Sequence, residues 1–141
     1  MATAIPVAAL ALLPILSQEI DTHWPNMPLR SSMAAQIEKE SCITLKHKKC
    51  WNTRAELKTD REYGFGLGQI TITKKFNVFE ELKASNKALA DWKWENRFDA
   101  RYQLRAVVIK DLQCFKAMKG TATPMDQLKM DEGCSKQPKL S

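Results

Sequence analysis

The sequence lacks several patterns that mark familiar kinds of enzyme. It has only two histidines, His23 and His47, and no Ser/His/Asp set with recognisable context. The glycines at Gly64, Gly66 and Gly68 are not followed by the Lys and Ser/Thr of a phosphate-binding P-loop, and their spacing is not that of a dinucleotide-binding loop. The chemistry that remains is that of carboxylates.

The four cysteines contain no CxxC pair and no His/Cys spacing typical of a zinc site. We therefore expect no metal and no other cofactor. Cys42 and Cys50 have seven residues between them, which is enough for a disulfide. Free thiols are the alternative, and the bridge would matter only if the protein works outside the cytoplasm.

No hydrophobic run is long enough to span a bilayer, so stable membrane insertion is not expected. The residues from Ala2 to Leu16 are almost wholly apolar, but no Lys or Arg precedes them and no small-x-small cleavage site follows. They therefore do not form a clear signal peptide, although that remains the alternative. Their leucines lie at helical spacing and predict a buried first helix with a kink or break near Pro14.

The net charge of +6 suits three kinds of partner: nucleic acid, an anionic membrane face or an acidic polymer such as cell wall. The one tight basic group, Lys46–Lys49, has no interleaved aromatic residues that could stack bases. Nucleic acid is therefore not expected as a partner.

The patterning predicts one mainly helical domain over residues 1–141, with at most a small β element and a flexible tail from about residue 132. The expected elements follow in chain order. They are a helix capped by Ser31 or Ser32 that ends near Ser41, a polar loop over 42–62 with at most one helical turn, a strand over 69–73, one or two short helices over 76–91, a long helix from about Asn96 to Lys119, and a last helix starting at Pro124.

Two motifs stand in order ahead of the long helix. The residues from Gln36 to Ser41 read Gln-Ile-Glu-Lys-Glu-Ser, and those from Tyr63 to Ile70 read Tyr-Gly-Phe-Gly-Leu-Gly-Gln-Ile. Over roughly residues 30–130 the chain thereby resembles the lytic transglycosylase (SLT) and goose-type lysozyme group, most of all its phage-encoded members. The resemblance implies a lysozyme-like α+β fold with a catalytic cleft. It also implies cleavage of the β-1,4 bond between N-acetylmuramic acid and N-acetylglucosamine in bacterial peptidoglycan.

Glu40 matches the catalytic acid of that group, and Ser41 matches the residue that orients the acid or the substrate. An acid that protonates the leaving oxygen must stay protonated near neutral pH, whereas a free Glu has a pKa of about 4.3. Burial and the C-terminal end of a helix both disfavour the carboxylate. Glu38 points in another direction on the helix. The blander interpretation of Glu40 is a solvated residue at a helix end.

The resemblance further implies a cleft floor at the glycine motif. Gly68 stands where the group usually has Met, which predicts a loosened subsite. Gln69 matches the sugar-binding glutamine. The candidate substrate-binding residues are Ser41, Tyr63, Gly66, Leu67, Gln69 and Ile70.

Two mechanisms remain open at this point. A lytic transglycosylase needs only Glu40, which protonates the glycosidic oxygen and then takes a proton from the muramic 6-hydroxyl to close a 1,6-anhydro ring. A hydrolase needs a second carboxylate, at ~6.5–9.5 Å in inverting enzymes, and Asp60 stands where goose-type lysozymes place a water-positioning Asp. The blander interpretation of Asp60 is a surface charge.

The chain lacks the Ala-Tyr-Asn motif that the group carries on a later helix, so a truncated, inactive wall-binding module is a third alternative. The implied partner is the glycan strand of bacterial peptidoglycan, on which the chain is expected to act as a monomer. The implied location is the periplasmic or extracellular cell wall, reached as a phage or secreted product.

Overall fold

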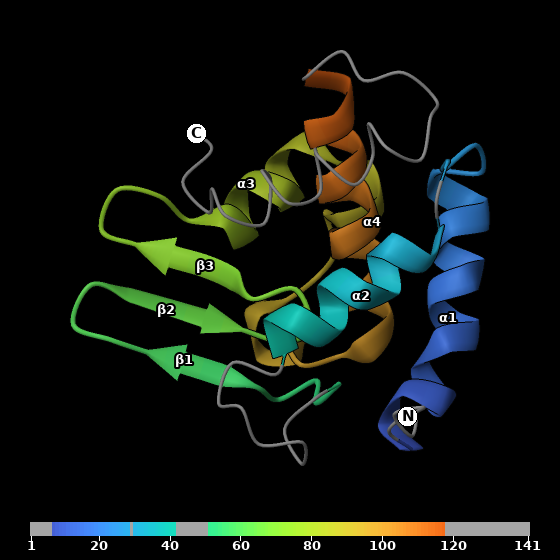
Figure 1. Cartoon of the computed structure of the whole chain (residues 1–141). Helices are drawn as coiled ribbons and strands as arrows, with labels where there is room; N and C mark the ends of the chain where they lie inside the picture. The colour runs from blue at the N-terminus through green and yellow to red at the C-terminus, as the bar shows by residue number, and fades with distance from the viewer. Residues whose placement is uncertain (1–6, 29, 42–50, 118–141) are drawn as a thin grey trace.

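Helices and one small antiparallel sheet make up the described part of the chain (Figure 1). A computed structural model describes residues 7–28, 30–41 and 51–117, except for the side chains of Val7 and Glu40. The helices are α1 (Val7–His23), α2 (Arg30–Ser41), α3 (Val78–Ser85) and α4 (Ala100–Ala117), with short 3-10 turns η2 (Lys87–Leu89) and η3 (Trp94–Asn96). The strands β1 (Glu56–Lys58), β2 (Glu62–Phe65) and β3 (Ile70–Thr73) lie in that order in the sheet. The predicted mainly α fold with a small β element is confirmed.

The first hydrophobic core joins α1, α2 and α4. Leu16 and Ile20 of α1 pack there with Ile37 of α2 and Leu104 of α4. Of the expected kink or break near Pro14, the break is wrong, because α1 runs through this exposed proline. A proline inside a helix costs about 3 kcal/mol, and the buried side chains on either side of it offset that cost.

A second core lies between the sheet, α3 and α4, and its largest members are aromatic: Phe65, Phe79 and Trp92. The turn between β2 and β3 connects the two cores. Leu67, inside the turn, belongs to the first core, while Phe65 and Ile70 on either side belong to the second. The glycine motif is therefore held from both sides.

Strands β1 and β2 are the main elements that the sequence did not predict. Strand β1 lies within the expected loop 42–62, and its three residues are all exposed. A strand with three exposed residues that pairs with β2 shows no apolar alternation. The predicted strand over 69–73 and the short helices over 76–91 are confirmed by β3, α3 and η2.

Two helix starts differ from expectation. Because α2 begins at Arg30, Ser31 and Ser32 lie in its first turn instead of capping it. The long helix begins at Ala100, after the 3-10 turn η3, rather than near Asn96. The predicted helix from Pro124, the tail and the Cys42–Cys50 pair lie outside the described residues. Within the described part, Cys114 is disulfide-bonded, and no helix is long and apolar enough to cross a membrane.

Candidate functional site

The buried side chain of Ser41 anchors the C-terminal end of α2 through two hydrogen bonds. The helix ends at Ser41 as predicted, with Glu40 as its penultimate residue. The Ser41 side chain is fully buried, and its hydroxyl donates to the Ile37 carbonyl (2.7 Å) and accepts from the Trp51 backbone N–H (2.8 Å). Ser41 therefore ties the helix end to the segment that begins at Trp51. Its hydroxyl proton is committed to the chain's own backbone.

The structure does not describe the side chain of Glu40, but it does describe the place of residue 40 on α2. Residue 40 follows Gln36 by four positions and Ile37 by three, so helical geometry puts it on the face of α2 between them. Ile37 is buried in the first core. Gln36 lines a pocket together with Gly68 and Ile70 of the second motif. Position 40 is thus one helical turn from side chains that face the glycine turn.

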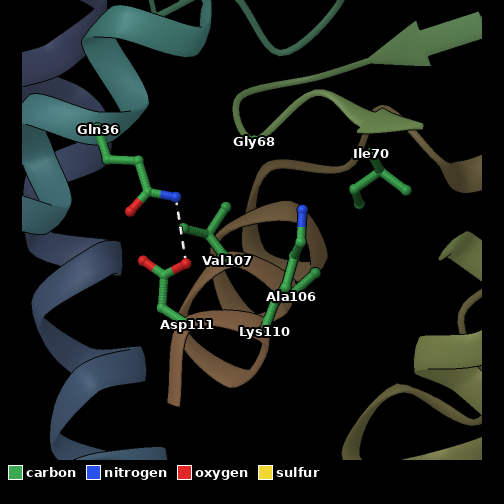
Figure 2. A pocket seen from close by; sticks show the side chains of 7 residues that line it. All are labelled: Gln36, Gly68, Ile70, Ala106, Val107, Lys110 and Asp111. Carbon is green, nitrogen blue, oxygen red and sulfur yellow. Dashed lines mark hydrogen bonds between the residues drawn. The ribbon is translucent and has the colours of Figure 1, made fainter. Parts of the chain in front are cut away.

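That pocket lies between α2, the glycine turn and α4 (Figure 2). Gln36 reaches from α2 toward α4, where its Nε2 donates to Oδ1 of the buried Asp111 at 3.1 Å. The remaining lining residues are Gly68, Ile70, Ala106, Val107 and Lys110. The pocket has a volume of about 10 Å³, which is room for about one water molecule and smaller than a sugar ring.

Gly66 opens the turn in a conformation that a side chain would strain. Its φ is +78°, and an added Cβ would lie 2.7–2.9 Å from the amide group of Gln103. That amide accepts from the Leu67 backbone N–H at 3.0 Å, and it donates to the carbonyls of Thr53 (2.8 Å) and Arg97 (2.9 Å). Gln103 of α4 therefore joins three segments of the site.

Sequence reasoning missed Gln103. It is 1% exposed, although glutamine is seldom so buried. The only available signal was a polar residue directly beside Leu104, which begins the apolar stripe of α4.

Gly68 packs directly against α4. An added Cβ would stand 2.6 Å from Cγ2 of Val107. The side chain of Val107 occupies the space that a larger residue at position 68 would need, and the loosened subsite stays a prediction.

Gln69 carries two unfavourable features at once. Its φ is +47°, in the left-handed region that residues other than glycine rarely adopt. Its side chain is 8% exposed, and Nε2 donates to the Gly66 carbonyl at 2.9 Å, while Oε1 is buried with no donor. Oε1 lies over Gly64, where a Cβ would stand only 2.9 Å away. Strained backbone and unsatisfied buried acceptors persist mainly where function requires them.

Asp60 is exposed in the turn between β1 and β2. Figure 1 shows this turn at the end of the hairpin that points away from α2. The structure therefore brings the glycine motif to α2 but does not bring Asp60 there.

Tyr63 is half-buried on β2. Its hydroxyl donates to the carboxylate of Glu56 and accepts from Nε of Arg97 at 3.3 Å. Burial, and then the bond to Glu56, raise the pKa of the phenol above its ordinary value. Tyr63 is therefore a protonated, oriented group near neutral pH.

Within residues 7–28, 30–41 and 51–117, no three His, Cys, Asp or Glu side chains come together in a way that could hold a metal ion. Comparison of the chain with protein-family models, with curated proteins and with solved structures gives no match. The two motifs and their arrangement in the fold are therefore the features that bear on function.

Proposed function

We propose that the chain cleaves the β-1,4 bond between N-acetylmuramic acid and N-acetylglucosamine in bacterial peptidoglycan, with Glu40 as the general acid. The observation that carries this proposal is the meeting of two motifs that are distant in sequence. Gln36, on the helix that ends in Glu40–Ser41, lines the same pocket as Gly68 and Ile70 of the glycine motif. Helix geometry puts position 40 beside Gln36, one turn farther along α2.

The surroundings of position 40 suit a proton donor. It is the penultimate residue of α2, where the partial negative charge of the helix C-terminus disfavours a carboxylate. That position at the helix end favours a Glu40 that is still protonated when the sugar oxygen must leave.

The arrangement favours the transglycosylase over the hydrolase. Asp60 is exposed at the far end of the β1–β2 hairpin, so Asp60 does not serve as the second carboxylate beside position 40 that the hydrolase would need. With one carboxyl group, Glu40 donates its proton to the glycosidic oxygen and then accepts the proton of the muramic 6-hydroxyl. The oxygen of the 6-hydroxyl then bonds to the anomeric carbon in place of the departing glycosidic oxygen. This step closes the 1,6-anhydro ring and consumes no water.

The test is the release of soluble fragments from purified peptidoglycan by Glu40→Gln. The amide is nearly the size of the carboxyl group but has no acidic proton, so we expect a loss of about 10²–10⁴-fold. Glu38→Gln is the matched control, because Glu38 is an exposed residue of the same helix and loses the same charge. It is expected to retain the wild-type rate, as is Asp60→Asn. A Glu40→Gln variant that cuts as fast as the wild type, or a wild type that binds wall without cutting it, contradicts the proposal.

A further inference from the structure

One tryptophan stands apart from the other three. Trp24, Trp51 and Trp92 are at most 5% exposed, whereas Trp94 is 42% exposed. Its ring is nonetheless held in place by aromatic neighbours. The ring centroids of Phe79, Phe65 and Tyr63 lie 5.3, 5.6 and 6.0 Å from that of Trp94, with interplanar angles of 60–83°. An exposed aromatic ring held by edge contacts is ordered before any ligand arrives.

Cationic side chains lie over the rings around Trp94. The guanidinium carbon of Arg97 lies 4.4 Å from the centroid of Trp94 and 4.6 Å from that of Phe98. Arg54 lies 5.2 Å from the centroid of Phe98, and the ammonium of Lys58 lies 5.7 Å from that of Tyr63. We call Arg54, Lys58, Tyr63, Trp94, Arg97 and Phe98 the Trp94 patch. In the described part of the chain, its three cations take part in none of the ion pairs.

The Trp94 patch is connected to the glycine turn through one side chain. The amide of Gln103 donates to the carbonyl of Arg97 (2.9 Å) and accepts from the N–H of Leu67 (3.0 Å). The ring of Phe65, the residue that precedes Gly66, is in edge contact with Trp94. The patch is therefore positioned by the same residues that hold the turn.

We infer that the Trp94 patch is a glycan subsite, which stacks one N-acetyl amino sugar of the strand on Trp94. The inference depends on the proposed function for the identity of the glycan. A pyranose ring has an apolar face of C–H bonds, which carry partial positive charge and match the electron-rich face of an indole. Its rim hydroxyl and acetamido groups need donors and acceptors. The guanidinium of Arg97, which lies over the Trp94 ring, and the hydroxyl of Tyr63, which accepts from Arg97, supply these next to the indole.

The charges of the Trp94 patch favour a sugar over a nucleic acid. Glu56 accepts the hydroxyl of Tyr63, and Glu95 and Asp99 directly follow Trp94 and Phe98 in the sequence. These three carboxylates equal the three cations of the patch in number. A nearly neutral surface gains little from phosphates, whose neutralisation by Lys and Arg dominates nucleic-acid binding, but it can still stack and hydrogen-bond a sugar.

Acrylamide quenching of tryptophan fluorescence tests the inference, because Trp94 is the only one of the chain's four tryptophans that is substantially exposed. The measurement uses the full chain with Glu40→Gln, so that no substrate is cut, and the soluble tetramer of N-acetylglucosamine as the probe. We expect the tetramer to protect Trp94 from the quencher. Trp94→Ala should weaken tetramer binding by about tenfold.

Two further variants keep this result interpretable. Trp94→Phe retains an aromatic face and should bind with intermediate affinity, even if Trp94→Ala perturbs the fold. Leu57→Ala removes an exposed apolar side chain of similar exposure, 41%, from outside the patch, and it should bind like the parent.

The outcomes separate this inference from the proposed function. Protection of Trp94 in a protein whose wild type does not cut wall supports the subsite and contradicts only the cleavage. Cleavage by the wild type, with Trp94 left unprotected and Trp94→Ala binding like the parent, overturns the subsite alone. Stronger protection by a thymidylate oligonucleotide than by the sugar tetramer also overturns it.

Discussion

Two buried regions of the molecule contain polar groups: the contact between α1 and α4, which we call the seam, and the glycine turn between β2 and β3. They differ in whether these polar groups have partners. At the seam, Glu19 is 4% exposed and accepts from Nε of Arg105 (2.7 Å) and from Arg101 (2.9 Å), while His23 lies 3.4 Å away. Arg105 also donates to the carbonyl of Ala88. Every oxygen of the buried carboxylate has a cationic partner, which is the arrangement of a group that holds helices together.

The glycine turn, in contrast, contains unfavourable features that no interaction offsets. Gln69 has a left-handed backbone and a buried acceptor without a donor, and either feature costs on the order of 1–3 kcal/mol. The frame around Gln69, by contrast, is well bonded through Gln103. The comparison indicates that the seam serves stability, whereas the turn is a rigid frame around a strained residue, which we propose binds the sugar. Substitutions in the two regions should therefore have different effects.

The largest expected effect comes from the frame of the turn. Gly66→Ala forces a side chain into a positive-φ position and against the amide of Gln103. Left-handed strain costs about 1–2 kcal/mol and overpacking about 1–3 kcal/mol, so we expect a loss of about 3 kcal/mol in the free energy of unfolding. Urea denaturation measures it. An Ala variant as stable as the wild type would mean that the turn is not rigid.

Gly68→Ala separates steric collision from backbone strain. At this position only Cγ2 of Val107 is in the way, at 2.6 Å. The double variant with Val107→Ala should therefore be more stable than the sum of the single effects predicts, by about 1 kcal/mol. The same Val107→Ala change should give no such recovery to Gly66→Ala, whose collision is with Gln103.

Glu19→Gln should weaken the seam by about 2–3 kcal/mol, somewhat less than a fully buried pair, because Arg101 is 45% exposed. Burial raises the pKa of the Glu19 carboxyl, but the hydrogen bonds from Arg105 and Arg101 outweigh it and hold the pKa below its ordinary value. Such a carboxyl contributes stability that is full above its unfolded pKa, about 4.3, and is lost as the pH falls through the folded value.

The pH dependence gives the sharper readout for the seam. Thermal unfolding followed from pH 7 downward should show the wild type losing its advantage over Glu19→Gln below about pH 4.3. A stability difference that stays constant down to acid pH would show that the Glu19 charge is not what joins α1 to α4.

The smallest effect on stability is expected at Gln69. Gln69→Gly relieves the left-handed backbone and removes the acceptor that has no donor, but it adds flexibility to the unfolded chain. These contributions offset one another, so the free energy of unfolding should change by less than about 1 kcal/mol. Release of fragments from peptidoglycan should nevertheless fall. If Gln69→Gly unfolds readily but cuts peptidoglycan normally, then Gln69 serves stability like the seam and is not needed for binding.

The sequence predicted what periodicity and local chemistry encode. The end of α2 at Ser41, strand β3 and the short helices over 76–91 follow from such signals. Strand β1 was missed because its residues are all exposed, and β2 was missed because Gly64 and Gly66 predicted a turn there. Helix α1 passes through Pro14 because tertiary burial outweighs a local penalty.

Within the site, the motif residues could be proposed, but the contacts that hold them could not. Gln103 and Val107 approach the glycines from a helix some 35–40 residues away, and no local pattern reports such a contact. The exposure of Trp94 likewise depends on which of four tryptophans the two cores leave outside.

Mass spectrometry of the fragments released from purified peptidoglycan tests the central claim most directly. The proposed chemistry predicts glycan fragments that end in 1,6-anhydro-muramic acid, produced by the wild type and not by Glu40→Gln. Fragments with intact glycan strands and cut peptides, or anhydro ends that persist in Glu40→Gln, would contradict it.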